Sequence, residues 1–515
     1  MKLKFPIGIQ SFEVIRTEGY YYVDKTPFVK MLVDEGKYYF LSRPRRFGKS
    51  LFIDTLKQAF LGKKELFKDL YLYDNWDWNV TYPVIHISFG SGVVREKSVL
   101  EKKMDYIVSD HAEKYKVCLK KEIISDKFFE LIKKLAEKYN QKVVVLVDEY
   151  DKPILDNIEN PETAIEMREA LKNFYSVLKD ADPYLKFVFL TGVSKFSKVS
   201  IFSGLNNLKD ITLHPKYGTI CGYTQSELET VFADALEGAN LEEIKLWYNG
   251  YNFLSEPVYN PFDILLYLDS KTLRPYWFET GTPTFLIKFL LQKRFNFTSL
   301  EHLEAGEEIV ESFDIDKLNP ITLLFQTGYL TIDYVEELSP EYRLYHLKYP
   351  NLEVKTAFNR HLLDYFTDDV TLKTQNIVKI FKILKSANLE ALKEVFQSFF
   401  ASIPYDWYRK NNINEYEGFY ASVVYAYFSA LGVDVRVEDA TSVGRLDMAV
   451  IFEDRCYIFE FKVIELDKSK GKALAQLKEK GYHEKYLNQY KEVYLIGVEF
   501  SKERKNVVGF KWEKL

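Results

Sequence analysis

The feature that most restricts the fold of this chain is an apolar run ending in two acidic residues, "KVVVLVDEYDKP" (142–153). Its five apolar residues, Val143 to Val147, do not alternate with polar ones. Such a run is typical of a central strand of a parallel sheet, buried on both faces. It therefore favours an α/β fold. Burying the charges of Asp148 and Glu149 at the end of this strand would cost free energy without a cation or a partner. This makes them candidate site residues.

A second stretch, "KYYFLSRPRRFGKSLFIDTLKQAFLG" (37–62), predicts a strand, a loop and a helix. Gly48-Lys49-Ser50 lies where the helix begins. The free N–H groups of a helix N-terminus attract phosphate, and Gly48 lets the backbone approach it. Lys49 would reach the β- and γ-phosphates and Ser50 would bind Mg²⁺. The usual motif has a glycine where this chain has Arg43, so this stretch alone leaves open a basic turn without a nucleotide.

Together the two stretches favour a P-loop ATPase core. Asp148 would support Mg²⁺, and Glu149 would orient and deprotonate the attacking water. A further predicted strand, "KFVFLTGVSKFS" (186–197), runs into polar residues. Either Thr191 or Ser194 could sense the γ-phosphate there, or the strand could end in an ordinary polar turn.

The carboxyl-terminal part indicates a second chemistry. Asp447 and the Glu460-Phe461-Lys462 triplet lie on neighbouring predicted strands. Residues i and i+2 of a strand share a face, so Glu460 and Lys462 project together and Asp447 can join them. Two carboxylates and a lysine on one face predict a Mg²⁺ site with an ammonium beside its water. An exposed charged strand is the alternative.

The element order around these residues is helix, three strands, helix and strand. It matches the αβββαβ core of the restriction-endonuclease-like PD-(D/E)xK nucleases. The predicted bounds are helix 416–432, strands 434–438, 446–452 and 456–463, helix 472–487 and strand 491–500.

Several stretches between residues 21 and 283 resemble the bacterial AAA-ATPase-like family: "YYVDKTPFVKML", "LSRPRRFGKSLF", "VLVDEYDKPIL", "LTGVSKFSKVSIFSGLNNLKDIT", "CGYTQSEL", "WYNGY", "VYNPFDIL" and "YWFETGTP". The resemblance implies that Arg43 belongs to the family's own loop pattern, RPRRFGKS. Arg45 or Arg46 is then hypothesised to add positive charge over the phosphates. The last part of the chain resembles the nuclease-like domain that commonly follows this ATPase. That resemblance implies Glu417 as a further acidic ligand and Gln476 as a polar residue near the metal.

These observations predict four segments in an α/β multidomain chain. A P-loop core with a parallel sheet would occupy 1–220, and a helical lid 221–285. A helical or winged-helix-like connector would occupy 286–400, and the nuclease-like domain 401–515. Thr224 and Glu227 predict a capping box at the start of the lid. The winged-helix interpretation is based on two strand-like runs, 328–335 and 342–350. A plain helical connector is the alternative.

Composition limits the partners. The formal net charge is −5, so any nucleic-acid contact must be a local basic patch. Three scattered cysteines give neither a disulfide framework nor a metal motif. The start lacks the apolar core of a signal peptide, and no apolar run has the ~20 residues that span a membrane. A cytoplasmic protein without a membrane partner is expected, possibly a homo-oligomer.

The sequence therefore predicts an ATP-binding and ATP-hydrolysing protein coupled to a Mg²⁺-dependent nuclease-like domain. ATP would shift the domains and control access to DNA or RNA. The alternative is a nucleotide-dependent switch or scaffold whose carboxyl-terminal domain binds a partner without cutting it. The expected cofactors are ATP and Mg²⁺.

Overall fold

The structure is a computed structural model of the whole chain. It describes all residues except 1–2, 196–197, 203–204, 206, 278–283, 294, 310–317, 368, 404–416, 439, 442–443 and 466–470. Among the described residues, no helix is both long and apolar enough to cross a membrane.

The chain divides into two compact units, each built from two segments. The first unit contains Met1–Arg274 and Ala305–His346, and the second contains Pro275–Glu304 and Leu347–Leu515. The residues of the predicted connector, 286–400, are thus shared between the units. The four boundaries expected from the sequence remain a prediction.

A five-stranded sheet in the order β2-β3-β4-β1-β5 forms the centre of the first unit. Its strands are β1 (Tyr38–Ser42), β2 (Val84–Ser88), β3 (Val143–Asp148), β4 (Leu185–Gly192) and β5 (Lys209–Asp210). All neighbours pair in parallel. The sheet confirms the predicted α/β core. It also shows that β4 separates the strand before the loop, β1, from the strand that ends in Asp148.

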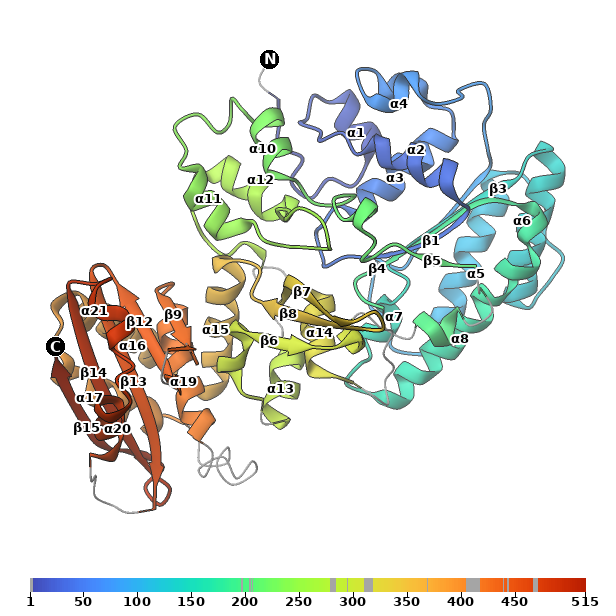
Figure 1. Ribbon diagram of the computed structural model, residues 1–515. Helices are drawn as coiled ribbons and strands as arrows, with labels where there is room; N and C mark the ends of the chain where they lie inside the picture. The colour runs from blue at the N-terminus through green and yellow to red at the C-terminus, as the bar shows by residue number, and fades with distance from the viewer. Residues whose placement is uncertain are drawn as a thin grey trace. The chain divides into compact units, whose positions relative to one another are not determined.

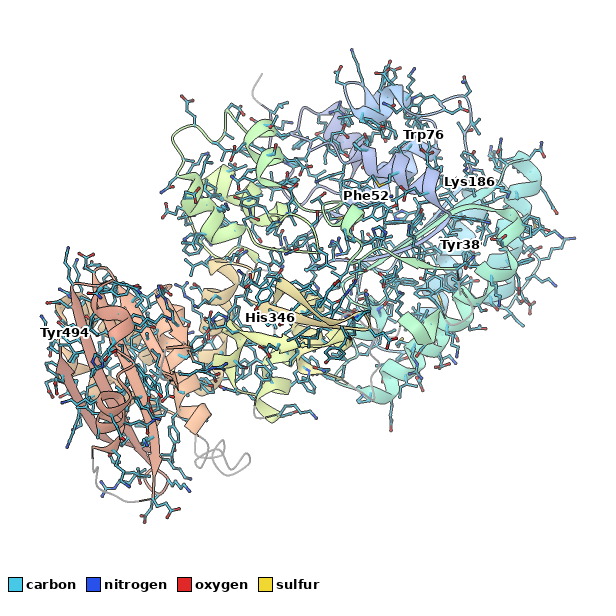
Figure 2. The ribbon with its side chains drawn as sticks, viewed as in Figure 1. Tyr38, Phe52, Trp76, Lys186, His346 and Tyr494 are labelled. Atoms are coloured by element: carbon cyan, nitrogen blue, oxygen red, sulfur yellow. The ribbon has the colours of Figure 1, made fainter. Side chains whose placement is uncertain are left out.

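Helices cover both faces of this sheet (Figure 1). Figure 1 shows α3 (Lys49–Phe60) on one side, and α5 (Lys97–Lys114), α6 (Ile124–Tyr139) and α8 (Pro161–Asp180) on the other. Figure 2 labels Phe52 of α3. Its ring packs against that of Phe189 in β4, with 5.8 Å between the centroids. Every residue of β1 and β3 is buried, as their uninterrupted apolar runs predict.

The other helices of the first unit include the predicted lid. They are α1 (Phe12–Thr17), α2 (Thr26–Glu35), α4 (Tyr71–Asp74), α7 (Lys152–Leu155), α9 (Lys198–Ile201), α10 (Gln225–Val231), α11 (Leu241–Tyr248), α12 (Pro261–Ser270) and α14 (Pro320–Thr327). The capping box predicted at Thr224 and Glu227 is confirmed at the start of α10.

The two strand-like runs of the predicted connector are β7 (Thr331–Ser339) and β8 (Tyr342–Lys348). They form a three-stranded sheet with β6 (Leu303–Ala305), in the order β6-β8-β7. Charged side chains are frequent on β7, where Asp333, Glu336 and Glu337 are all acidic. A wing of this charge is unsuited to contact a nucleic-acid backbone.

The second unit contains a mixed sheet in the order β15-β14-β13-β12-β9. The helices of this unit are α13 (Thr284–Gln292), α15 (Leu352–Phe366), α16 (Val370–Ser386), α17 (Leu389–Ala401), α19 (Glu417–Ala430), α20 (Lys472–Lys480) and α21 (Glu484–Leu487). Its strands are β9 (Asp434–Val437), β10 (Ala440–Thr441), β11 (Gly444–Arg445), β12 (Met448–Phe452), β13 (Arg455–Ile464), β14 (Glu492–Ser501) and β15 (Asn506–Lys514). Only β13 and β14 pair in parallel.

The predicted αβββαβ order is confirmed, with two differences. The helix expected over 472–487 is divided into α20 and α21 by Gly481, whose φ of +63° ends the first helix. Strand β15, which the sequence analysis did not anticipate, extends the sheet beyond β14.

Alternate residues of β13 face opposite sides of this sheet. Phe459 packs against Phe396 of α17 and Phe428 of α19, with centroid separations of 6.2 and 5.5 Å. Helix α20 covers the other side. Its backbone comes so close to β14 that a Cβ atom on Gly497 would lie 2.3 Å from the Leu474 nitrogen. This close approach places α20 over the face that carries Glu460 and Lys462.

We therefore expect Gly497→Ala to destabilise the second unit by about 1–3 kcal/mol, because the new methyl group meets helix backbone that cannot rotate away. Urea unfolding measures the loss. The control is Ala475→Ser, on an exposed position of α20, which should change stability by less than about 0.5 kcal/mol. Equal stability of the two variants would contradict this packing.

Candidate functional sites

The loop between β1 and α3 has the local geometry of a phosphate-binding loop. Gly48 adopts φ +87°, and a Cβ atom placed on it would meet nothing within 4 Å. Open space therefore lies beside the first turn of α3, where backbone N–H groups are unpaired. Ser50 lies in this turn. The loop thus fits an anionic ligand such as a triphosphate.

Lys49 is buried, and its Nζ donates to the carbonyl oxygens of Arg43 and Pro44 at 2.9 Å each. Burial lowers the pKa of Lys49, while the negative charge of Asp148 acts in the opposite direction. This ammonium is held inside the loop and close to the acidic end of β3. Both features match the predicted role of Lys49 beside phosphate and Mg²⁺.

Arg43 occupies the position of the missing glycine and is only 1% exposed. Its guanidinium donates to the carbonyls of Ser42 and Thr212 at 2.9 and 2.7 Å. It also donates to the carbonyls of Tyr217 and Gly218 at 3.1 and 3.3 Å. Burial lowers the pKa of Arg43 to about 10. All these acceptors are backbone atoms, so Arg43 fastens the loop to residues 212–218.

Two further residues of the loop are anchored in the first unit. Phe47 is buried and meets the ring of Tyr251 edge-on, with 4.7 Å between centroids. Pro44 lies against Gly328, where a Cβ atom would come within 2.7 Å of the proline ring. The loop is thus fixed by side-chain contacts in addition to its backbone hydrogen bonds.

The two arginines hypothesised to lie over the phosphates differ in their surroundings. The guanidinium of Arg46 stacks on the ring of Phe262 at 3.7 Å from the centroid. Burial lowers the pKa of Arg46, and the charge of Asp263 opposes this. Arg45 is exposed beside it. The contact of either arginine with phosphate remains a prediction.

At the end of β3, Asp148 is buried and accepts a hydrogen bond from Thr191 Oγ1 at 2.9 Å. Thr191 belongs to β4, which lies between β1 and β3. In the register of the sheet, Thr191 pairs with Leu41 of β1. Thr191 thus lies on the strand between β1 and β3 and bonds to Asp148, while its contact with a nucleotide remains a prediction.

Glu149 has the left-handed backbone conformation, with φ +55°. For a residue with a side chain this conformation costs energy, and such outliers gather at functional sites. Burial, followed by the charge of Asp148, raises the pKa of the Glu149 carboxyl. The carboxylate lies near Gly90, since a Cβ atom there would be 3.2 Å from Oε2. Glu149 therefore points beyond the end of β2 and is suited to act as a base.

Asp151 is a buried residue of this site that the sequence analysis missed. Its carboxylate accepts hydrogen bonds from the Ser194 nitrogen and hydroxyl at 2.8 and 2.9 Å. Burial raises the pKa of Asp151, and the bonds from Ser194 and Val193 act against this. The hydroxyl of Ser194, one of the two candidate γ-phosphate sensors, is therefore bonded to Asp151. Asp151 could have been found from the sequence, because it is the third acidic residue of "DEYD" (148–151).

Lys195, the residue after Ser194, was also not predicted from the sequence. Its Nζ and that of Lys198 share the carboxylate of Asp210, each at 2.8 Å. Its backbone nitrogen donates to Gln326 Oε1 of α14 at 2.7 Å. No local sequence pattern could have revealed a partner 131 residues away.

In the second unit the predicted carboxylates and lysine do come together. Asp447 Oδ2 accepts a hydrogen bond from the Phe461 nitrogen at 2.8 Å, which places it between Glu460 and Lys462. Glu460 is 3% exposed and accepts a hydrogen bond from Gln476 Nε2 of α20. Lys462 is half-buried on the same strand face. Glu417 begins α19, but its side chain lies outside the described residues.

Two more residues complete this site. Burial, then the charges of Glu460 and Asp447, raises the pKa of Tyr482. Glu499 pairs in register with Lys462, but its carboxylate accepts hydrogen bonds from the Lys472 and Ala473 nitrogens at the start of α20. Tyr482 and Glu499 lie beyond the E-x-K pattern, which is why it did not reveal them.

Within the described part of the chain, no group of three or more His, Cys, Asp or Glu residues has the arrangement of a metal site. Mg²⁺ usually keeps several waters and needs only one or two protein carboxylates. Asp447 and Glu460 supply the carboxylates that such a Mg²⁺ site requires.

Comparison with known proteins identifies the two parts of the chain that contain these residues. Residues 6–202 match the family described as Predicted AAA-ATPase, and residues 415–510 match the PD-(D/E)XK nuclease superfamily. The chain is also 48% identical over 513 residues to the "Uncharacterized protein in vnfD 5′region" of Azotobacter chroococcum mcd 1, covering 99% of each. This chain therefore belongs to the family of predicted AAA-ATPases that carry a PD-(D/E)XK nuclease-superfamily domain.

The contacts of Arg43 generate a prediction that runs against the usual motif. Arg43→Gly restores the expected first glycine, but it leaves buried carbonyls without donors and opens a cavity. We expect a loss of more than about 3 kcal/mol in the free energy of unfolding, together with weaker ATP binding. Urea unfolding and titration with a fluorescent ATP analogue measure the two effects.

The matched control is Arg45→Gly, two residues away on an exposed position. Its free energy of unfolding should change by at most about 1 kcal/mol. If Arg43→Gly is as stable as Arg45→Gly, the anchoring role of Arg43 is wrong.

Proposed function

We propose that this protein binds and hydrolyses ATP in its first unit and that its second unit is a Mg²⁺-dependent nuclease acting on DNA or RNA. The observation that carries the first half is that buried Lys49, at the start of α3, lies close to buried Asp148, which ends β3 and is bonded to Thr191 of β4. The second half is carried by Asp447, whose bond to the Phe461 nitrogen sets it beside Glu460.

At the ATP site the chain's own groups supply binding, orientation and a base. The α3 N-terminus and Lys49 hold the phosphates, and Ser50 and Asp148 hold the Mg²⁺ ion. When bound, Mg²⁺ would neutralise charge on the phosphates. Glu149 accepts the proton of the attacking water, and its raised pKa makes it a stronger base than an ordinary glutamate. Thr191 orients Asp148.

At the nuclease site Asp447 and Glu460 hold the metal, with Gln476 fixing the Glu460 carboxylate. Lys462 lies on the same face and stabilises the attacking water and the developing negative charge. A metal, a polarised water and a nearby cation are the elements of metal-dependent phosphodiester hydrolysis.

A binding-only role of the second unit is the competing function. The net charge of −5 favours it, because nucleic-acid enzymes usually carry a basic surface. The presence of Asp447, Glu460 and Lys462 on one face favours the nuclease. All three cysteines are free, which supports a cytoplasmic location as part of this proposal.

For the ATP site we expect Lys49→Ala to abolish ATP binding. Glu149→Gln should bind ATP but hydrolyse it ~10²–10⁴-fold more slowly, because the base is lost. Hydrolysis by the native chain should fall as the pH drops through the raised pKa of Glu149, since the base must be unprotonated. The acid limb of kcat/KM should therefore lie above pH ~4.3. Phosphate release measured against pH tests both points, and wild-type turnover by Glu149→Gln would refute the assignment.

For the nuclease site we expect Mg²⁺ or Mn²⁺ to raise the Tm of the nucleotide-free chain through mass action. Asp447→Asn and Glu460→Gln should remove this gain and all cleavage of a mixed DNA and RNA panel. Lys462→Ala should keep the gain and lose cleavage. The control, Glu453→Gln in the exposed turn after β12, should keep both. Metal binding without cleavage, with or without ATP, would make the binding-only role the better account.

A further inference from the structure

We propose that the loop of residues 89–95, which leads from β2 toward α5, holds the carboxylate of Glu149 in position for ATP hydrolysis. Lys103, Lys152 and Asn157 act as positioning residues, because they fix this loop by its backbone. The proposal rests on the role of Glu149 as the base in the proposed function. It adds to the ATP site a segment that lies outside both sequence motifs of that site.

The loop begins beside the acidic end of β3. Ser88, the last residue of β2, pairs with Asp148 in the register of the sheet. The Phe89 nitrogen then donates to the Asp148 carbonyl at 3.3 Å, so the first residue of the loop still follows β3. Gly90 comes next. A Cβ atom on Gly90 would lie 3.2 Å from Oε2 and 3.5 Å from Cδ of Glu149. The loop backbone therefore forms a wall beside this carboxylate.

This wall limits where the carboxylate can lie. The backbone of Glu149 has φ +55°, which sets the direction in which its side chain leaves the chain. Contact with Gly90 then restricts the side chain at its far end. A base must lie within hydrogen-bond reach of the water that it deprotonates, and a misplacement of about 1 Å can cost about 10²-fold in rate. The position of the loop should therefore influence the rate of hydrolysis.

Two lysines hold the loop from different helices. Lys103 of α5 donates from its Nζ to the carbonyl of Phe89, at 3.3 Å, and to that of Ser91. Lys152, the first residue of α7, donates to the Gly92 carbonyl at 3.0 Å. All three acceptors are backbone oxygens of the loop, so these bonds fix the path of the loop itself.

The segment that ends α7 is bonded to the loop as well. Asn157 is 4% exposed, and its Nδ2 donates to the Val94 carbonyl at 2.6 Å. Arg95 of the loop donates in return to the Asp156 carbonyl at 2.6 Å. Helix α7 begins three residues after Glu149. The loop and the segment that follows Glu149 are therefore bonded to each other, which keeps the wall against the carboxylate.

The two glycines of the loop differ in what a side chain would meet. Gly92 has φ +71°, so any other residue would be strained there, although nothing lies within 4 Å. Gly90 does not have a positive φ, so its backbone conformation is not restricted to glycine in this way. The obstacle at Gly90 is the lack of space beside Glu149. Substitution of Gly90 should thus move the carboxylate without changing the net charge of the site.

The test measures ATP hydrolysis by the full chain as kcat and KM, together with the Kd of a fluorescent ATP analogue and the Tm. We expect Gly90→Ala to lower kcat by about 3–10-fold, because the carboxylate must shift by a few tenths of an ångström. Gly90→Val, with its larger side chain, should lower kcat further. KM, Kd and Tm should stay near the native values, since Gly90 is exposed and alanine there removes no bond. If Gly90→Val lowers the Tm, Gly90→Ala alone decides.

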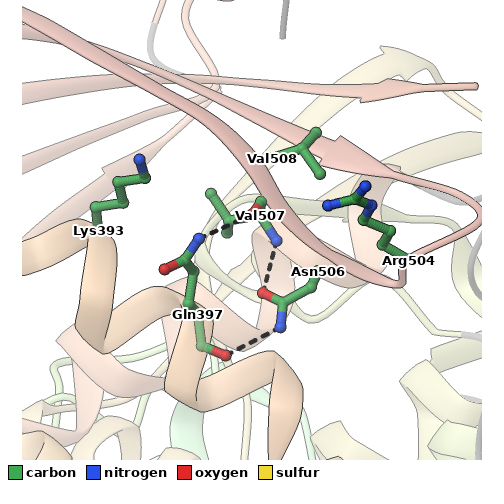
Figure 3. Close-up of a pocket in the computed structure, with 6 residues that line it drawn as sticks. All are labelled: Lys393, Gln397, Arg504, Asn506, Val507 and Val508. Carbon is green, nitrogen blue, oxygen red and sulfur yellow. Dashed lines mark hydrogen bonds between the residues drawn. The ribbon is translucent and has the colours of Figure 1, made fainter. Parts of the chain in front are cut away.

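The matched control is Ser91→Ala, at the next exposed position of the loop, which keeps the backbone bond to Lys103. Its kcat should stay within about twofold of the native value. A remote control is Lys393→Met in the second unit, where Lys393 lines a pocket with Gln397 and Asn506 (Figure 3). It removes a positive charge outside the ATP site and should leave kcat unchanged.

Lys103→Met with Lys152→Met should lower kcat as Gly90→Ala does. Lys103→Arg with Lys152→Arg keeps the donors and should recover most of the rate. Because both lysines also carry charge near Glu149, the deciding comparison is made at Gly90 in the Glu149→Gln background. The base is absent there, so Gly90→Ala should cause no further loss.

The inference is overturned if Gly90→Ala and Ser91→Ala have the same kcat. It is also overturned if Gly90→Ala slows hydrolysis equally in the native and Glu149→Gln chains, because the loop would then act independently of the base. Hydrolysis by Glu149→Gln at the native rate is a different outcome. In that case the base itself is misassigned, and the proposed function of the ATP site fails.

Discussion

The burial of one guanidinium, that of Arg43, determines where the nucleotide loop can lie. Its donors reach carbonyls in β1 and in residues 212–218, so the loop start is joined at one side chain to the segment that follows the edge strand β5. Phe253 closes the arrangement by packing its ring 3.8 Å from the guanidinium carbon. The position of Lys49 follows, because its ammonium bonds to the carbonyls of Arg43 and Pro44. Here an arginine supplies through side-chain bonds the loop geometry that the usual motif obtains from a glycine.

Helix α14 contacts both elements that surround the ATP site. Gly328 at its end touches Pro44 of the loop, and Gln326 bonds the backbone of Lys195 after β4. Gln326 also donates to the Ile309 carbonyl, so the helix is tied to the preceding segment of the same unit. A shift of the loop or of the end of β4 must therefore displace α14 or break one of these contacts. These contacts link the loop and the end of β4 to α14 within the first unit.

Much of the fold and site was predictable because the responsible patterns are local. The apolar runs of β1 and β3 determine their burial, and strand parity places Glu460 beside Lys462. The pairing of Asp447 with β13 followed from a short turn between two strands. The rest depends on contacts between distant segments. Arg43 bonds residues 169 to 175 positions away, and Gln326 bonds Lys195 across 131 positions. Strand β15 was missed because its alternation includes charged residues that suit an exposed segment equally well.

The division of each unit into two segments affects how the chain can fold during synthesis. Residues 275–304 belong to the second unit, but residues 305–346 complete the first. Phe297 and Leu300 are buried in the second unit, and Glu301 forms an ion pair with Lys355 at 2.6 Å. These partners have not been made when residue 304 leaves the ribosome. At ~5–20 residues per second, the intervening segment takes a few seconds to synthesise. During that time the apolar side chains of 275–304 must be kept from incorrect contacts. The first unit can complete its fold only when residues 305–346, which follow this segment, have been synthesised.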